Sequence, residues 1–225
     1  MAWYIFAGVL LAAAGAMAAP SIEPPEAAAA YAEGERLLAQ GEWVRAAQVF
    51  EQLAGQYPES PSLPVFAFQR AKANYYLGDY GKAVAGFSYI LSRFPDSPEI
   101  PYATFFLGNA YYRRGELDRA VNQYLAAYRQ STDDRLSVLA GKSLLALLED
   151  AGSITLGAGD FANMPADRRC PLMKEVADVL LGHGQTSAAS ELLADCGKTL
   201  DAGTEETARR RRENRSEEPT SELQS

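Results

Sequence analysis

Small, apolar and aromatic positions recur along the chain with a period of 37 residues. Three series of residues carry this period: Gly41, Gly78 and Gly115; Ala46, Ala83 and Ala120; and Phe50, Phe87 and Tyr124. A period in this range is typical of stacked supersecondary units. The pattern therefore predicts three repeats, each built from one pair of helices.

The coarse pattern places each helix between turn signals. The predicted pairs are 26–39 with 43–56, 63–77 with 80–93, and 99–114 with 117–130. A seventh helix is predicted at about 134–149, with Gly152 as its stop signal. A later hairpin begins with a helix at about 171–181. Glycines just after a helix can take a left-handed conformation without a Cβ penalty. We therefore expect Gly41, Gly78 and Gly115 to start the tight turn inside each hairpin.

The connection between repeats is itself repeated. Tyr57–Pro64 returns as Phe94–Pro101. Serine caps helices through its hydroxyl group, and proline is tolerated in the first turn, where its missing N–H would have no partner. The sequence predicts that Ser60 and Ser97 cap the next helix and that Pro61 and Pro98 occupy its first turn.

Small residues at repeat-equivalent positions predict a close helix crossing in each hairpin, because a bulky side chain there would force the helices apart. We expect Gly34, Ala71 and Gly108 to face Ala46, Ala83 and Ala120. The chain resembles a tetratricopeptide repeat (TPR) array over about 26–131. In this resemblance Gly34, Ala71 and Gly108 match the small position of the first helix. Pro58 and Pro95 match the closing proline. The resemblance implies an all-α fold, a right-handed superhelix of antiparallel helix hairpins.

The resemblance also implies a ligand groove lined by the first helix of each repeat. Carried over by register, the groove residues are Tyr31, Phe68, Lys72, Tyr75, Tyr76, Tyr102, Phe105, Asn109, Tyr112 and Arg113. Aromatic rings with a few polar groups suit an extended or helical peptide. We expect about half of these side chains to be core, and Tyr75, Tyr112 and Asn109 to be exposed. Recognition of a C-terminal carboxylate is not expected, because Tyr31 and Glu35 occupy the first-repeat positions of such a clamp.

The second half of the chain, 132–200, follows the repeat pattern weakly. Ser153–Arg169 reads as a surface insertion rather than a binding loop, given its length and its glycines. Cys170 and Cys196 fall at the two ends of the later hairpin, which favours a disulfide over two free thiols. In the same hairpin, Ala177 is expected to lie against Ala189.

The two ends of the chain have a different composition. Residues 1–18 are apolar and end in a small-x-small pattern, which predicts a secretory signal peptide, with an uncleaved membrane anchor as the alternative. Residues 19–25 read as a linker. Residues 201–225 read as a disordered tail containing Arg209–Arg212, and 215–225 resemble a translated sequencing adapter.

Composition and motifs limit the chemistry. The 225 residues carry a formal net charge of −8 and a pI near 4.8, which argues against a nucleic-acid surface. The single histidine, His183, lies between two glycines and reads as a turn residue. We predict no metal site, no cofactor and no catalytic residue, because no spacing of carboxylates, cysteines or glycines matches a known motif.

The signal-like start and the repeated linker resemble the TPR region of bacterial envelope proteins, both the Tol-Pal-associated cell-division coordinator and the outer-membrane assembly lipoprotein. The implied role is a periplasmic or secreted, non-enzymatic adaptor that binds a protein or peptide partner, touching a membrane only through an uncleaved N-terminus. Two alternatives remain open: the helical front of a peptidoglycan-acting enzyme, and a penicillin-binding-protein activator. No cysteine follows the apolar run, so acylation is not expected.

Overall fold

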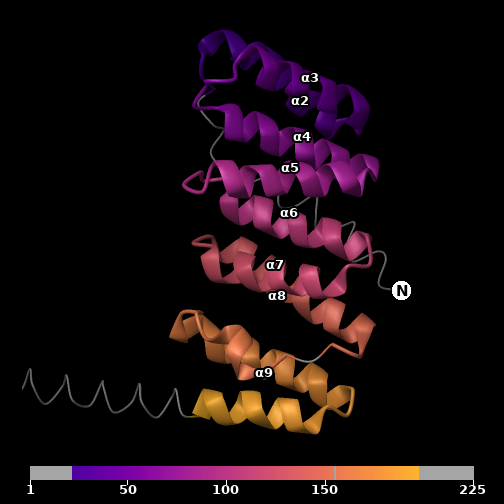
Figure 1. Cartoon of the computed structure of the whole chain (residues 1–225), viewed down its shortest axis with the longest axis vertical. Coiled ribbons are helices and arrows are strands. Elements are labelled where there is room, and N and C mark those ends of the chain that lie inside the picture. The colour runs from indigo at the N-terminus through magenta and orange to yellow at the C-terminus, as the bar shows by residue number, and fades with distance from the viewer. Residues whose placement is uncertain (1–21, 155, 198–225) are drawn as a thin grey trace, which may run out of the picture. The chain divides into compact units, whose positions relative to one another are not determined.

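The computed structural model describes residues 22–154 and 156–197, and within them every regular element is a helix (Figure 1). The predicted signal segment, 1–18, and the predicted tail, 201–225, lie outside the described residues. The chain divides into two compact units, 1–147 and 148–225, which are described separately.

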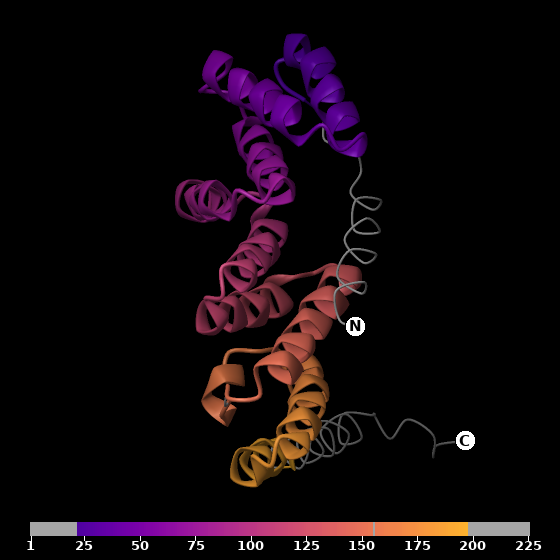
Figure 2. The ribbon, with the colours of Figure 1, turned by 90° about the vertical axis from the view of Figure 1, so that its right-hand side faces the viewer.

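The first unit contains the three predicted hairpins. They are α2 (Ala28–Ala39) with α3 (Trp43–Gln56), α4 (Leu63–Leu77) with α5 (Tyr80–Arg93), and α6 (Ile100–Arg113) with α7 (Leu117–Gln130). A 3-10 turn, η2 (Pro25–Ala27), precedes α2. Each helix packs against the next one along the chain (Figures 1 and 2). The observed helix ends lie within two residues of the predicted ones, because the 37-residue pattern marks both ends of every helix.

The turns inside the hairpins have the predicted left-handed backbone. The φ angles of Gly41, Gly78 and Gly115 are +77°, +87° and +75°. At Gly78 the backbone N–H closes the end of α4 on the carbonyl of Tyr75, 3.0 Å away. A side chain at such a φ is strained, so glycine at these three positions sets the geometry of the turns.

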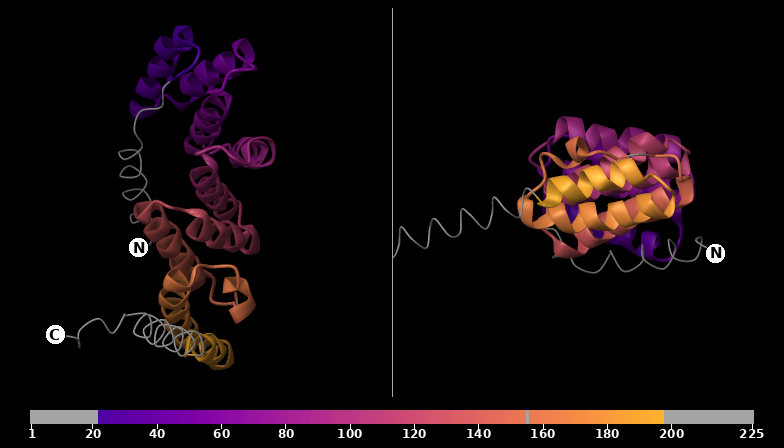
Figure 3. Two further views of the ribbon diagram at one scale, coloured as in Figure 1. Left: turned by 90° about the vertical axis from the view of Figure 1, so that its left-hand side faces the viewer. Right: turned by 90° about the horizontal axis from the view of Figure 1, so that it is seen from below.

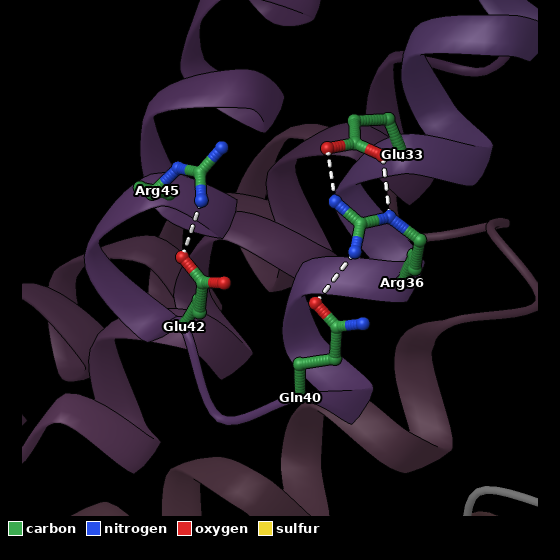
Figure 4. A network of polar contacts seen from close by, with 5 residues as sticks. All are labelled: Glu33, Arg36, Gln40, Glu42 and Arg45. Atoms are coloured by element: carbon green, nitrogen blue, oxygen red, sulfur yellow. Dashed lines mark hydrogen bonds and ion pairs between the residues drawn. The ribbon is translucent and has the colours of Figure 1, made fainter.

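Ion pairs surround the turn of the first hairpin (Figure 4). Arg36 donates to both carboxylate oxygens of Glu33, at 2.6 and 2.7 Å, and to Gln40. Arg45 donates to Glu42 on the other side of the turn. These side chains are exposed, and solvent screens exposed pairs strongly. The turn therefore depends on its glycine more than on these charges.

A close crossing occurs in each hairpin, but the partners differ from those we expected. A Cβ added to Gly34 would lie 2.6 Å from the ring of Phe50, and one added to Gly108 would lie 2.9 Å from the ring of Tyr124. In the second hairpin Ala71 meets Gly86. The nearest atoms at these crossings therefore do not belong to the predicted partners Ala46, Ala83 and Ala120, which are nevertheless fully buried.

The helices after the linkers begin near the predicted positions, but not with the predicted cap and first-turn residues. The residues that directly precede α4 and α6 are Ser62 and Glu99, and neither caps through its side chain. Pro64 and Pro101 occupy the first turns. The predicted residues form a turn before each helix instead, closed by an N–H···O bond across Ser60–Leu63 and its equivalent across Ser97–Ile100. These observations correct the roles predicted for Ser60, Pro61, Ser97 and Pro98.

The helix α8 (Asp134–Ala151) runs from the first unit into the second. The second unit also contains α9 (Ala166–Gly182) and a helix at 186–197, which lie side by side (Figure 3). The predicted disulfide between Cys170 and Cys196 joins these two helices and is confirmed. Ala177 and Ala189 are both fully buried, and His183 lies in the turn as predicted.

The segment before α9 was predicted to be a surface insertion, and this prediction is wrong. The segment contains a 3-10 helix, η3 (Ala158–Phe161), and α9 begins five residues before the predicted start. Leu156, Phe161 and Met164 are buried, with Phe161 fully so. Because three apolar side chains are removed from water, the segment forms part of the core of the second unit.

Candidate functional site

The candidate site is the face formed by the first helices of the hairpins, α2, α4 and α6. We call the ten predicted groove residues on these helices the helix-A face. Residues 37 apart occupy equivalent positions, so Tyr31, Phe68 and Phe105 form one row and Lys72 and Asn109 belong to another. The structure divides the ten side chains into two groups of equal size by burial.

Five of the ten are core residues, which confirms that about half are buried. They are Tyr31, Phe68, Tyr75, Phe105 and Asn109, all with exposed fractions of 7% or less. Tyr31, Phe68 and Phe105 are buried because an aromatic ring of the first helix packs against one of the second helix in every hairpin. The ring centroids are 5.7 Å apart for Tyr31 and Phe50, 5.9 Å for Phe68 and Phe87, and 6.0 Å for Phe105 and Tyr124.

The expectation that Tyr75 and Asn109 are exposed is wrong. The ring of Tyr75 packs edge-on against Phe106, with centroids 5.7 Å apart, and burial raises the pKa of its hydroxyl. The side chain of Asn109 is 2% exposed and accepts a hydrogen bond of 2.8 Å from the hydroxyl of Tyr124. Both residues therefore stabilise the repeats.

Phe106 explains much of this burial, and sequence reasoning missed it. Its ring lies within 6.3 Å of the centroids of Phe68, Tyr75 and Tyr76. The equivalent residues of the other repeats are Ala32 and Gln69, so the periodic pattern gives no signal for an aromatic residue here.

Gln69 is a second residue that the sequence did not single out. Its amide nitrogen donates to the hydroxyl of Tyr31 at 3.0 Å and to the carboxylate of Glu35 at 3.4 Å. Tyr31 in turn donates to Glu35 at 3.0 Å. This polar network links α2 to α4, and burial is the main cause of the raised pKa of Tyr31.

Lys72 lies half-buried beside this network. Its ammonium nitrogen is 6.0 Å from the centroid of the Phe106 ring. Burial lowers its pKa, and the nearby charge of Glu35 acts in the opposite direction. No ion pair of Lys72 occurs within the described residues. A partly desolvated cation of this kind interacts more strongly with an anionic group than a fully hydrated one does.

Tyr76 and Arg113 are equivalent residues at the turn end of the helix-A face, and each joins two neighbouring repeats. The ring of Tyr76 stacks on Trp43 of the first hairpin, with centroids 4.9 Å apart. The guanidinium group of Arg113 lies 5.1 Å from the ring centroid of Tyr80, which is the equivalent of Trp43. Burial raises the pKa of Tyr76 to about 12. Tyr76 remains half-buried and Arg113 exposed, so both are accessible to a partner.

Tyr102 lies at the opposite end of α6 and contacts the start of α8. Its hydroxyl donates to Asp133 over 2.5 Å, and burial is the first cause of the rise of its pKa to about 12. The other carboxylate oxygen of Asp133 accepts from the backbone N–H of Arg135 at 2.9 Å. Tyr102 and Tyr112 are both partly exposed.

Comparison with known proteins identifies the family. The model of the outer membrane lipoprotein family YfiO matches residues 24–142, which is more than half of the chain. The chain belongs to the YfiO outer membrane lipoprotein family. The matched region contains all ten residues of the helix-A face. A search of the curated proteins finds no match.

Solved structures show that this YfiO family chain has an all-α, TPR-like fold. Two crystal structures of the nearly identical TPR-like repeats of a Podosopora anserina kinesin light chain are similar to it, at 15% and 16% sequence identity. Their TM-scores are 0.52 and 0.51; the similarity covers 83% and 81% of this chain, and 100% and 99% of theirs. At this identity the likeness concerns the fold alone.

The YfiO family supports a protein-interaction scaffold of the cell envelope. Across 22–154 and 156–197, no helix combines the length and apolar character that crossing a bilayer requires. Both cysteines of the sequence are joined in the disulfide of the second unit.

Proposed function

We propose that this protein is a non-enzymatic adaptor of the bacterial cell envelope that binds a peptide or domain of a partner protein on the helix-A face. The family match over the three hairpins is the observation that carries the proposal. The family's scaffold role favours the adaptor over the two alternatives that the sequence left open, the truncated enzyme and the penicillin-binding-protein activator. The predicted signal segment favours a periplasmic or secreted location.

The accessible half of the helix-A face supplies the binding groups in this proposal. Lys72, Tyr76, Tyr102, Tyr112 and Arg113 are all at least partly exposed. Tyrosine rings offer large contact areas at a low cost in conformational entropy, and arginine adds a planar cation; both residue types are enriched at interface hot spots. The buried half acts differently, because its rings fix the backbone on which the accessible side chains are held.

A matched pair of variants tests the proposal. One variant replaces Tyr76 and Arg113 by alanine. The control replaces Tyr89 of α5 and Arg45 of α3 by alanine, a tyrosine and an arginine that are exposed on the second helices of the hairpins. Partners captured from envelope fractions by the unchanged chain are identified by mass spectrometry, purified, and titrated against both variants.

We expect the helix-A variant to bind the purified partner at least about thirtyfold more weakly, since hot-spot truncations cost about 2 kcal/mol or more. The control variant should bind as the unchanged chain does. Equal losses in both variants, with folding intact by circular dichroism, would rule out the helix-A face as the binding surface.

A further inference from the structure

The first linker holds an additional segment of the chain. The backbone N–H of Glu23 donates to the hydroxyl of Ser62 at 2.9 Å, and the hydroxyl of Ser60 donates to the carbonyl of Glu23. Pro24 follows with an extended backbone, φ −71° and ψ 160°. The linker therefore binds a proline-containing segment through two serine hydroxyls that pair with its backbone.

The second linker has the same backbone turn, but no segment of the described residues 22–154 and 156–197 is hydrogen-bonded to it in the same way. Ser97 and Glu99 are the equivalents of Ser60 and Ser62, and there the hydroxyl of Ser97 donates to the carboxylate of Glu99 instead. A pocket of about 560 Å³ lies between the two linkers. Its volume falls within the range of sites that bind small ligands or single peptide segments.

The lining of the pocket is apolar and acidic. Pro61, Pro64, Pro95 and Pro98 line it together with Val65 and Phe94. The charged residues at the pocket are three acids, Glu23, Asp96 and Glu99, and one base, Arg93. Glu99 is only 5% exposed, although it is a carboxylate. Buried carboxylates normally have several hydrogen-bond donors or a cation as partners.

The geometry points to this pocket as a docking site for a proline-containing segment of a partner protein that carries a basic residue. The segment lies on Ser97 and Glu99 as Glu23 and Pro24 lie on the preceding linker. The Ser97 hydroxyl turns from Glu99 to donate to the carbonyl of the segment, and the carboxylate of Glu99 accepts from the backbone N–H of the segment instead. The basic side chain of the segment faces Asp96 and Glu23. The proline rings of the pocket pack against the proline of the segment. This site is separate from the helix-A face, so its failure would leave the proposed function standing.

The chain's own docked segment supplies the probe. We would titrate the ¹⁵N-labelled full chain with the blocked peptide acetyl-Ile-Arg-Pro-Pro-amide, which is the sequence of residues 22–25 with arginine in place of Glu23. The control peptide keeps the glutamate. Amide shifts are followed at the non-proline residues of 94–99 and 62–65, and dissociation constants are taken from the titrations.

Two exposed acids one repeat apart make a matched pair of variants. Asp96 lines the pocket, whereas Glu59 is its equivalent in the first linker and does not. We expect Asp96→Asn to weaken binding of the arginine peptide about threefold, as for an exposed charge pair, and Glu59→Gln to leave it unchanged. Glu99→Gln should weaken binding about tenfold, provided that the variant melts close to the unchanged chain.

The expected shifts are confined to the two linkers, and the glutamate peptide should bind more weakly than the arginine peptide. The inference is overturned if the arginine peptide causes no shifts there at millimolar concentration. It is also overturned if Asp96→Asn and Glu59→Gln behave alike. Because both of these residues are exposed, this comparison holds even if Glu99→Gln does not fold.

Discussion

The helix crossings show how single residues control this fold. Gly34 lies at the crossing of α2 and α3, and an added Cβ would come within 2.6 Å of the buried ring of Phe50. The ring cannot retreat freely, because it also packs against Tyr31. The sequence predicted the close approach from the small residue. It could not show which residue of the second helix lies nearest, since that depends on the axial offset of the two helices.

Gly34→Ala should therefore lower the free energy of unfolding. The reason is overpacking, which costs about 1–3 kcal/mol in a tight core, against a gain of up to about 1 kcal/mol in helix propensity. Gly55→Ala is the control, because Gly55 lies in α3 with no atom within 4 Å of an added Cβ. Chemical denaturation should show a loss for the first variant and a gain of up to about 1 kcal/mol for the second. A gain at both positions would contradict the crossing described here.

Tyr102 and Asp133 give a pH-dependent prediction. The Tyr102 hydroxyl is the largest cause of the lowered pKa of Asp133. A lowered pKa in the folded state means that the charged carboxylate stabilises the fold above its unfolded pKa, which is about 3.9, and that this stabilisation is lost as the pH falls toward the folded-state value. Tyr102→Phe should raise the pKa of Asp133 toward its ordinary range in a carbon-detected NMR titration. An unchanged titration curve would show that the bond does not hold in solution.

Burial on the helix-A face was only partly predictable at this scale. The repeat register predicted which side chains lie in the same row, and it predicted correctly that about half of them are buried. The register has a limit, however. It could not show that Phe106 covers Tyr75, because burial there depends on one residue that breaks the repeat pattern. The prediction for Asn109 was wrong for a similar reason. An asparagine on a helix face is expected to be exposed unless its hydrogen-bond partner, here Tyr124, is known.

At the scale of elements, the repeated sequence predicted the hairpins well and the linkers less well. Helix ends followed the glycines and the aromatic positions, because those residues set the turns and the core directly. On sequence grounds, the two serine–proline pairs are as compatible with the start of a helix as with a turn before it. In the structure they form a turn, and Pro64 and Pro101 lie in the first turns of the helices instead.

The structure of the second unit was harder to predict from the sequence than that of the hairpins. Its segment before α9 was predicted from glycine content to be a surface insertion, yet Leu156, Phe161 and Met164 are buried. Three isolated apolar residues without a period give no signal of the surface on which they pack. The disulfide was predictable, since two cysteines at the open end of a hairpin are close in any antiparallel arrangement.

Reduction of the Cys170–Cys196 bridge should destabilise the second unit selectively. The cysteines are 26 residues apart, and closing a loop of this length contributes about 3 kcal/mol through the unfolded state. Hydrogen exchange measured with and without reductant should show faster exchange in 166–197, while the amides of α4 to α7 keep their protection. Equal acceleration in both units would contradict a local role for the bridge.

At the scale of the whole molecule, the first helices of three TPR-like hairpins present a mixed aromatic and cationic face. The family match supports a scaffold in the envelope. The identity of the partner depends on the chemistry of the accessible side chains, and the repeat pattern alone does not determine it. Binding therefore has to be located on the molecule directly.

The most direct test is site-specific photocrosslinking in intact envelopes. A photoreactive amino acid is placed singly at Tyr76, Tyr102 or Arg113 on the helix-A face, and at Val44 or Tyr89, which are exposed on the second helices. We expect one and the same protein to crosslink at all three helix-A positions and at neither control position. Crosslinks to that protein at Val44 and Tyr89, with none from the helix-A face, would contradict this expectation.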